Sequence, residues 1–303
     1  MLVALSGGPD SLALAAATAF EAARAGTRAG AVVVDHGLQS GSADVAARAA
    51  EQARSLGLDP VVVRAVTVDA TGGPEAAARA ARYAALDEVA SETGAVLVLL
   101  GHTLDDQAET VLLGLARGSG PTSLHGMRPS TSSGSGVDYA RPLLGIRRSS
   151  TVQFCEDSGL EPWIDPQNAD PSFARVRARE TVLPLLEREL GPGIAEALAR
   201  TAEQLREDSD ALDHFAEELT EELAELAESG ISLPVHALAS NPPALRQRLI
   251  RLAVEGEFHV SLSRAQTLEV SRLITHWHGQ KALDLPGVRV ERRGSLLIFT
   301  ANG

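Results

Sequence analysis

The sequence has little lysine, cysteine or aromatic residue, and each shortage excludes a kind of chemistry. Lys281 is the only lysine, so the chain has no Walker A loop, which needs a lysine beside its glycines to hold the β and γ phosphates. Cys155 is the only cysteine, which excludes an intramolecular disulfide, a paired-thiol redox motif and a thiolate cage for zinc or an iron–sulfur cluster. Aromatic residues make up 3% of the chain, so few side chains are available to stack on nucleobases.

Long apolar runs are also missing. The runs at residues 31–34 and 96–100 have the length of strands and fall well short of the roughly 20 residues that cross a membrane. The N-terminus carries no basic targeting segment. With 44% hydrophobic and 22% charged residues, the 303-residue chain has the composition of a globular protein and enough length for two domains. We therefore expect a cytoplasmic protein without a membrane partner.

Basic charge is in deficit as well. The net charge of −13 argues against a general nucleic-acid binder, because non-specific affinity comes from basic side chains that neutralise phosphates. Arginines nevertheless occur in groups, which could form local basic faces or could reflect a compositional preference for arginine over lysine. The groups are Arg141/Arg147/Arg148, Arg175/Arg177/Arg179, Arg246/Arg248/Arg251 and Arg289/Arg292/Arg293.

One loop stands out among the features that are present: Ser6-Gly7-Gly8-Pro9-Asp10-Ser11. It follows the apolar run 2–5 and precedes the alanine-rich stretch 12–24, so a strand feeds a glycine turn that opens a helix. Glycines let the backbone approach an anion, and the free N–H groups and dipole of the first helical turn favour its charge. A phosphate loop without lysine indicates that the pyrophosphate end of ATP is held as a leaving group, and hence adenylation rather than γ-phosphoryl transfer.

The first third of the chain alternates strand and helix patterns. Apolar runs at residues 2–5, 31–35, 61–66 and 95–100 are separated by alanine-rich amphipathic stretches, which predicts an α/β fold: a Rossmann-like parallel sheet with helices on both faces. Ligands of such sheets bind beyond the carboxyl ends of the strands. Several of these ends carry glycine or polar residues, including Asp35-His36-Gly37 and Gly101-His102-Thr103.

The rest of the chain reads as a second, smaller domain. Residues 130–136 have the composition of a flexible loop, and Gly191-Pro192-Gly193 predicts a domain boundary. We expect an ATP-binding catalytic domain over 1–190 and a mainly helical substrate domain over 191–303. Within the latter, helical patterns cover residues 194–228, a stretch ending near 254, and 263–276, whereas residues 282–300 alternate like short strands with a turn at Arg293-Gly294.

Two carboxylates, Asp10 and Asp35, are predicted at the carboxyl edge of the sheet, where they could hold a Mg²⁺ ion against nucleotide oxygens. Taken singly, Asp10 could be a helix N-cap and Asp35 a turn former. The strand-end histidines His36 and His102 could likewise be structural hydrogen-bonding groups.

A second acidic group opens the helix after the fourth strand. Asp106 and Glu109 share one helix face at i, i+3 and could receive an ammonium group, although acidic residues also favour helix N-termini in general. Arg82 lies on the preceding helix with Arg79 one turn away. It could be a solvated charge, or it could stabilise negative charge that develops during displacement.

These residues resemble the N-type ATP pyrophosphatase (PP-loop) enzymes and, within that superfamily, the tRNA(Ile)-lysidine synthetases. The phosphate loop identifies the superfamily, and the further motifs occur in the family's order over residues 3–190. They are Val34-Asp35-His36-Gly37-Leu38, Glu75-Ala76-Ala77-Ala78-Arg79-Ala80-Ala81-Arg82-Tyr83, Gly101-His102-Thr103 continuing to Thr110, Arg117-Gly118-Ser119-Gly120, Arg141-Pro142-Leu143-Leu144, Asp165-Pro166 with Asn168, and Arg175, Arg177 and Arg179 before Val182-Leu183-Pro184.

The resemblance implies a two-step reaction on the wobble cytidine of a minor isoleucine tRNA with a CAU anticodon. ATP adenylates the oxygen on carbon 2 and releases pyrophosphate, and the amine of free L-lysine then displaces AMP, which changes the codon read from AUG to AUA. It further implies ATP and Mg²⁺ as cofactors.

The resemblance also assigns roles to matching positions. Asp106 and Glu109 would hold lysine, and Arg82 would assist the chemistry with Asp10. The nucleotide would lie on the phosphate loop near Asp35 and His36. Contacts to tRNA would come from Arg141, Arg175, Arg177 and Arg179. The residues assigned to ATP are Ser6, Gly7, Gly8, Pro9, Asp10, Ser11, Asp35 and His36, with Asp10 and Asp35 also assigned to the metal.

Two alternatives stay open. The chain could be another PP-loop ligase that adenylates a small carboxylate or base, although Cys155 lacks the flanking residues of a glutaminase nucleophile. It could instead be an ATP-binding sensor without turnover, a role that does not require Asp106, Glu109 and Arg82 together. A homodimer is compatible with either.

Overall fold

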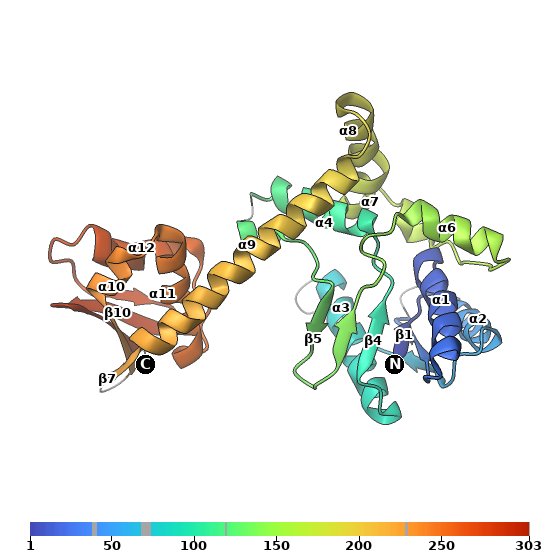
Figure 1. Ribbon diagram of the computed structural model, residues 1–303, viewed down its shortest axis with the longest axis horizontal. Helices are drawn as coiled ribbons and strands as arrows, with labels where there is room; N and C mark the ends of the chain where they lie inside the picture. The colour runs from blue at the N-terminus through green and yellow to red at the C-terminus, as the bar shows by residue number, and fades with distance from the viewer. Residues whose placement is uncertain (38–40, 68–73, 119, 228–229, 303) are drawn as a thin grey trace. The chain divides into compact units, whose positions relative to one another are not determined.

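The computed structural model describes residues 1–37, 41–67, 74–118, 120–227 and 230–302, and the chain divides into two compact units, Met1–Gln204 and Leu205–Gly303 (Figure 1). Leu38 and Ser119 of the motifs quoted above lie outside the described residues. The expected division into domains 1–190 and 191–303 stays a prediction. Helix α9, Ile194–Leu223, runs through the boundary between the two units.

The N-terminal unit is built on a mixed sheet. Within the described residues it has six strands in the order β3-β2-β1-β4-β6-β5. Every neighbouring pair is parallel except β5 and β6, which are antiparallel. The strands are β1 Leu2–Ala4, β2 Gly30–Asp35, β3 Val61–Ala65, β4 Leu97–Leu100, β5 Ser130–Ser132 and β6 Asp138–Ala140.

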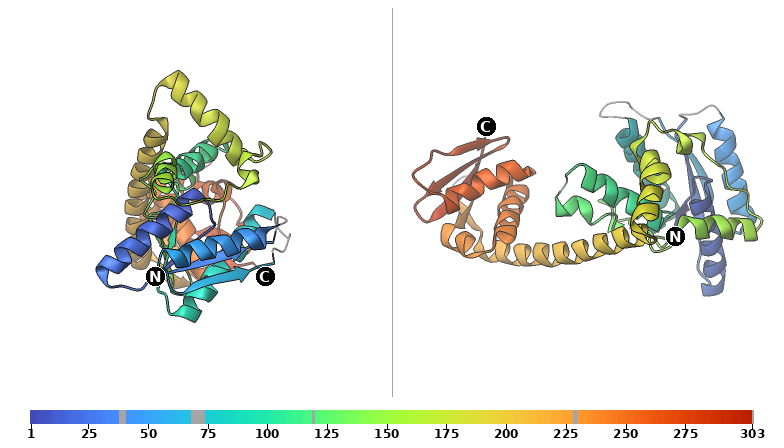
Figure 2. Two further views of the ribbon diagram at one scale, coloured as in Figure 1. Left: turned by 90° about the vertical axis from the view of Figure 1, so that its right-hand side faces the viewer. Right: turned by 90° about the horizontal axis from the view of Figure 1, so that it is seen from above.

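Helices cover both faces of this sheet because the side chains of each strand alternate between two apolar cores. Val3 and Val33 pack with helices α1, Pro9–Ala25, and α2, Ser42–Ser55, whereas Leu2 and Val32 pack with α3, Pro74–Thr93. Helices α1 and α2 lie side by side (Figures 1 and 2). The parallel-dominated α/β fold predicted from the sequence is confirmed.

The sheet order creates a switch point beside β1. The chain moves from β1 through α1 to β2 on one side, and returns through α3 to β4 on the other. In doubly wound sheets a ligand crevice forms at the carboxyl ends of the two strands that flank such a point. Here those ends carry the phosphate loop after β1 and Gly101-His102-Thr103 after β4.

Several short helices complete the N-terminal unit. Helix α6 packs against α1 and buries Cys155 in the same core as α1 and α2. Helix α4 packs against α7 and η2. These elements are α4 Leu104–Ala116, α5 Pro121–Leu124, α6 Arg148–Asp157, the 3₁₀ turn η1 Pro166–Ala169, α7 Ala174–Arg177, the π-turn η2 Ala178–Val182 and α8 Leu183–Leu190.

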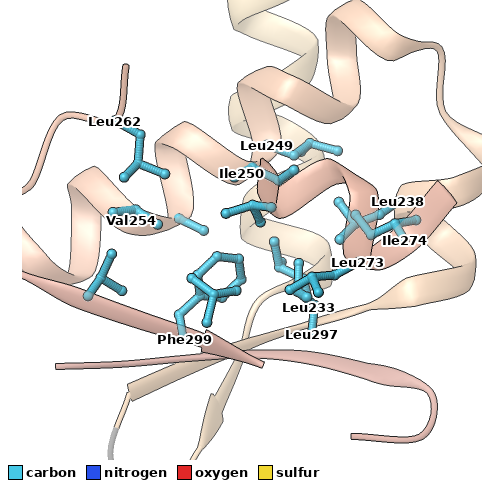
Figure 3. Packing of buried hydrophobic residues seen from close by; sticks show 14 of the residues in the cluster. Leu233, Leu238, Leu249, Ile250, Val254, Leu262, Leu273, Ile274, Leu297 and Phe299 are labelled. Carbon is cyan, nitrogen blue, oxygen red and sulfur yellow. The ribbon is translucent and has the colours of Figure 1, made fainter. Parts of the chain in front are cut away.

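The smaller C-terminal unit places helices against an antiparallel sheet with strand order β7-β8-β11-β10-β9. One apolar core fills the space between sheet and helices, with Phe299 and Leu297 of β11 against Leu249 and Ile250 of α11 (Figure 3). The elements are β7 Glu225–Ala227, β8 Gly230–Pro234, α10 Val235–Ser240, α11 Pro243–Phe258, α12 Arg264–Thr275, β9 Leu283–Leu285, β10 Val288–Arg293 and β11 Leu296–Ala301.

The strand pattern predicted for the C-terminal tail is confirmed, with the chain turning at Gly294 between β10 and β11. The helix expected over residues 194–228 is too long: α9 ends at Leu223, and β7 follows and pairs with β8. Gly230 is needed at the start of β8, because a β carbon there would run into the carbonyl oxygen of Phe299. In the part of the chain that the structure describes, no helix is both long enough and apolar enough to cross a membrane.

Candidate active site

The phosphate loop is held open by its own serines. The hydroxyl of Ser11 accepts a hydrogen bond from the N–H of Ser6 at 3.1 Å and donates to the carbonyl of Gly8 at 3.0 Å. Gly7 has φ +83°, a conformation that favours glycine. Gly8 is the N-cap of α1 and supplies no side chain to cap its N–H groups. The first turn of α1 therefore has backbone donors that an anion could accept from, and nucleotide binding at this loop stays a prediction.

Gly101 lets the end of β4 approach this loop. A β carbon there would lie 3.0 Å from the Cα of Ser11 and 3.1 Å from its N, so any larger residue would push α1 away from the strand. The close approach brings the residues after β4 next to the phosphate loop.

The acidic pair lies on the first turns of α4. Thr103 and Asp106 form a capping box in which the carboxylate of Asp106 accepts from the N–H of Thr103 at 2.8 Å and from its hydroxyl at 3.0 Å. Asp106 is 9% exposed and Glu109 is 0% exposed. Both face the same guanidinium groups, which confirms that they share one face of the helix. Buried carboxylates need cationic partners.

Arg148, the first residue of α6, is one such partner and touches three carboxylates. Its Nε donates to Asp10 at 3.0 Å, one terminal nitrogen donates to Asp106 at 2.9 Å, and the other lies 3.5 Å from Glu109. Its backbone N–H donates to Asp105 at 2.7 Å. A cation at a helix N-terminus is unfavourable, so these carboxylates are what hold it there.

The same contacts shift pKa values. Burial disfavours the charged form of Arg148, but the carboxylates of Asp106 and Asp10 outweigh it and raise the pKa of the guanidinium. Burial likewise disfavours the charged form of Asp106, yet Arg148 and the N–H of Thr103 hold the pKa of the Asp106 carboxyl below its usual value. Arg148 and Asp106 are therefore both charged at neutral pH.

Two of the arginines predicted to contact tRNA complete this cluster. Arg179 donates to the two oxygens of Glu109 at 2.6 and 3.0 Å. Arg175 donates to Glu109 at 3.0 Å and to the hydroxyl of Thr110 at 3.0 Å. The acidic pair thus already has guanidinium partners.

The other two predicted tRNA contacts lie elsewhere. Arg177 donates to the carbonyls of Pro171 and Ser172. Arg141 is buried and donates to the carbonyl of Arg128. A tRNA-binding role for Arg141, Arg175, Arg177 and Arg179 stays a prediction.

The two carboxylates predicted to bind Mg²⁺ have different surroundings. Asp10 accepts from Arg148 on one oxygen and from the hydroxyl of Thr151 on the other. Asp35 accepts from the N–H of Gly37 at 3.0 Å, as a strand-end turn former does. Among the described residues no group of three His, Cys, Asp or Glu side chains is arranged to hold a metal ion.

Arg82 and the strand-end histidines form a second, electropositive cluster. The Nε of Arg82 and the Nδ1 atoms of His36 and His102 are buried and have no hydrogen-bond partner within the described part of the chain. Burial lowers the pKa of Arg82. Burial also lowers the pKa of His102 to about 4, with Arg141 and Arg82 contributing and Asp106 opposing, and burial and Arg82 lower the pKa of His36. Both histidines are therefore neutral at physiological pH.

Sequence reasoning missed the roles of Arg148 and Thr151. Arg148 lies 138 residues from Asp10 and 42 from Asp106 in the chain, so no local spacing joins them. The signal available for Arg148 was its place in the arginine group Arg141/Arg147/Arg148.

Comparison with known families agrees with this geometry. Residues 1–186 match the model of a PP-loop domain, and residues 233–296 match the model of the TilS substrate binding domain. A curated relative named tRNA(Ile)-lysidine synthase, from Leifsonia xyli subsp. xyli, is 64% identical over 99% of this chain and 89% of its own length. The chain belongs to the tRNA(Ile)-lysidine synthase family.

Further relatives and a solved structure extend this finding. Family members from Streptomyces coelicolor and Thermobifida fusca are 52% and 51% identical over 98% and 97% of this chain, and over 84% and 89% of their own lengths. A solved structure, the U34-tRNA thiolase NcsA from Methanococcus maripaludis with its [4Fe-4S] cluster, has a TM-score of 0.56 and 22% identity, covering 68% of this chain and 72% of the other. That similarity concerns the fold alone. This chain, as a member of the tRNA(Ile)-lysidine synthase family, is a PP-loop enzyme that uses ATP.

Proposed function

We propose that the protein ligates L-lysine to carbon 2 of the wobble cytidine of an isoleucine tRNA with a CAU anticodon, using ATP and releasing AMP and pyrophosphate. The observation that carries the proposal is that Arg148 joins the phosphate-loop carboxylate Asp10 to the acidic pair Asp106 and Glu109. A site for a leaving pyrophosphate and a site for a cationic amine are thereby adjacent. Membership of the family supports the same reaction.

The phosphate loop binds ATP in this proposal. Backbone N–H groups of Gly7, Gly8 and the first turn of α1 meet the phosphates, with Ser6 and Ser11 shaping the loop. Pro9 at the start of α1 has no N–H to leave unpaired. Asp35 and His36, at the end of the neighbouring strand β2, border the nucleotide.

A Mg²⁺ ion fits beside this loop, because such ions bind through one or two carboxylates plus substrate phosphates. Asp10 has a carboxylate at the loop itself, and Asp35 offers a second at the adjacent strand end. When bound, the ion would neutralise charge on the phosphate oxygens. The loop's own N–H groups would orient the phosphates beside such an ion.

In the first step the oxygen on carbon 2 of cytosine attacks the α phosphorus, the bond to the bridging oxygen breaks, and pyrophosphate leaves. Negative charge develops on the phosphate oxygens. Arg82 suits its stabilisation, because it is a largely buried guanidinium whose Nε has no protein partner among the described residues. The neutral His36 and His102 add no competing cation.

In the second step an amine of lysine attacks carbon 2, AMP leaves with the oxygen, and the amine loses a proton. Asp106 and Glu109 suit the binding of the ammonium form, since both are buried carboxylates on one helix face. The product changes codon specificity from AUG to AUA. The C-terminal unit, which contains the match to the substrate binding domain, would hold the tRNA together with the predicted arginines, which are Arg141, Arg175, Arg177 and Arg179. We place the enzyme in the cytoplasm with its tRNA.

An assay of pyrophosphate release tests the proposal. Protein, Mg·ATP, lysine and an isoleucine tRNA transcript with a CAU anticodon should release pyrophosphate, and omission of lysine should stop stable product formation. An elongator methionine transcript with the same anticodon should not support it. Failure of every isoleucine transcript with a wobble cytidine to release pyrophosphate above background would reject the proposal.

A matched pair of variants places the reaction at the loop. Asp10→Asn should abolish the release, because the carboxylate that faces Arg148 and the phosphates loses its charge. Asp44→Asn should not, because Asp44 is an exposed acid in the first turn of the neighbouring helix α2.

A further inference from the structure

The guanidinium of Arg148 occupies the position that a substrate ammonium would need. Each of its three nitrogens faces a different carboxylate: Asp10 at 3.0 Å, Asp106 at 2.9 Å and Glu109 at 3.5 Å. Two of these carboxylates belong to the predicted lysine site and one to the phosphate loop. Arg148 is thus shared between the two substrate sites.

The neighbouring arginines do not bridge the sites in this way. Arg175 contacts Glu109, and Arg179 contacts Glu109 and Asp106. Among the ion pairs found in the described residues, only that of Arg148 reaches Asp10. Arg148 is therefore the group through which events at the phosphate loop can reach the acidic pair.

An incoming ammonium and the guanidinium cannot both lie against Asp106 without strong repulsion, because the site is largely buried and solvent screens such charges poorly. Arg148 makes the closest cationic contact to Asp106, at 2.9 Å against 3.5 Å for Arg179, so lysine binding requires Arg148 to withdraw. Bound nucleotide can attract Arg148 away from Asp106. Its phosphates are held at the loop that contains Asp10, and a guanidinium pairs strongly and bidentately with phosphate oxygens.

We propose that Arg148 is a positioning residue that keeps the lysine site closed until nucleotide binds. It stands in for the ammonium in the empty enzyme and turns to the phosphates when ATP is present. Separating Arg148 from the acidic pair costs free energy, and the ligand that binds first meets this cost for both. Bound nucleotide therefore raises the affinity for lysine, and by linkage lysine raises the affinity for nucleotide to the same extent. This inference rests on the proposed lysine site.

Calorimetric titration of lysine into the full chain tests the inference, with and without Mg²⁺ and the α,β-methylene analogue of ATP. For the unaltered protein we expect the dissociation constant for lysine to fall about tenfold or more when the analogue is present. In Arg148→Gln, lysine should bind the nucleotide-free protein more tightly than it binds the unaltered protein, and the analogue should change the dissociation constant less than about twofold.

Arg147→Gln is the matched control. Arg147 is the adjacent residue, and its guanidinium lies 3.5 Å from Asp105 and 3.6 Å from Glu196, away from the three shared carboxylates. This variant should keep the full effect of nucleotide. If Arg148→Gln does not fold, as judged by its thermal unfolding, Arg148→Lys keeps the positive charge but presents a point charge to fewer carboxylates, and it should show a reduced effect of nucleotide.

The outcomes separate this inference from the proposed function. Tight lysine binding to the unaltered protein without nucleotide, or an undiminished effect of nucleotide in the Arg148 variants, would overturn the role of Arg148 while pyrophosphate release continued to support the function. Absence of lysine binding under every condition, together with absence of lysine-dependent turnover, would overturn both.

Discussion

The two units of the chain differ in what they bury. The N-terminal unit buries Asp106, Glu109 and Arg141 beside its sheet, and its apolar side chains fall into separate clusters on the two faces. The C-terminal unit has one continuous apolar core (Figure 3). Among the residues of this unit whose burial is described, Arg246 is the buried charged side chain, and it donates to the carbonyl of Asn241.

This difference shows which unit holds charge for a purpose other than stability. Apolar burial contributes roughly 25 cal/mol per Å², whereas a buried ion pair contributes little net stability because both charges lose their hydration. A cluster such as Asp106, Glu109 and their arginines therefore contributes little to the net stability of the fold. Its position at the carboxyl edge of the sheet, beside a phosphate loop, fits a reaction site.

The largest effect should come from Glu109→Gln. Glu109 is 0% exposed and is bonded to Arg175 and Arg179, so removal of its charge leaves two partly exposed guanidinium groups without their buried carboxylate partner. We expect the free energy of unfolding to fall by about 4 kcal/mol. Urea unfolding measures it. The half-exposed Glu196, paired with Arg147 at 3.6 Å, is the control, and Glu196→Gln should cost less than about 1 kcal/mol. Equal losses would remove the contrast between buried and exposed charge.

A cavity in the C-terminal core should come next. Leu249 is 0% exposed, and Leu249→Ala should lower the free energy of unfolding by about 3 kcal/mol. Because the core contains no group of the predicted site, the affinity for the ATP analogue should not change. Leu268→Ala, at a position 37% exposed on α12, should have little effect on either. If the folded Leu249→Ala variant lost affinity for the nucleotide, then nucleotide binding would not be confined to the N-terminal unit, contrary to this account.

Acid should destabilise the protein through His102. The pKa of this histidine is lowered from 6.5 to about 4 by burial. The unfolded chain therefore binds a proton as the pH falls below 6.5, while the folded protein does not until about pH 4, and stability drops across this window. We expect a loss of about 2 kcal/mol between pH 6.5 and pH 5.

Urea unfolding at these two pH values, compared with His102→Asn, isolates the contribution. The variant should show a smaller drop. Asp106 does not contribute to the difference between these two pH values. Its pKa is lowered below 3.8, so its contribution to the free energy of unfolding is lost only at more acidic pH. An unchanged pH dependence in His102→Asn would contradict the assignment.

The smallest of these effects should be the most selective. Asparagine at position 106 can still accept from the N–H of Thr103 and cap α4, but it lacks the charge that attracts an ammonium. In Asp106→Asn we expect the KM for lysine to rise about tenfold, with the KM for ATP changed much less. Steady-state kinetics with each substrate varied in turn measure both. Equal changes would show that Asp106 does not belong to the lysine site.

Local signals in the sequence were enough to predict the local geometry of two parts of the candidate site. The phosphate loop is a contiguous strand, turn and helix, and the spacing of Asp106 and Glu109 fixes one helix face. The contacts of Arg148 could not be predicted, because they depend on how α6 packs against α1 and brings its first residue within reach of α4. Likewise, Arg175, Arg177 and Arg179 form one group in the sequence, yet packing places Arg175 and Arg179 on Glu109.

Two elements of the fold show the same limit. Residues 130–136 were expected to be a flexible loop, but residues 130–132 form β5, which pairs with β6 opposite Tyr139. Serine and threonine can form an edge strand when a neighbouring strand is available for pairing. The composition of the segment alone does not reveal that neighbour. The helical pattern that continues to residue 228 is likewise interrupted, because β7 gains a partner in β8.

The central claim is that the first turn of α1 holds the two phosphates that leave, and identification of the nucleotide products tests it most directly. With Mg·ATP, lysine and isoleucine tRNA, ³¹P NMR should show AMP and pyrophosphate in equal amounts. Formation of ADP and inorganic phosphate would contradict the account.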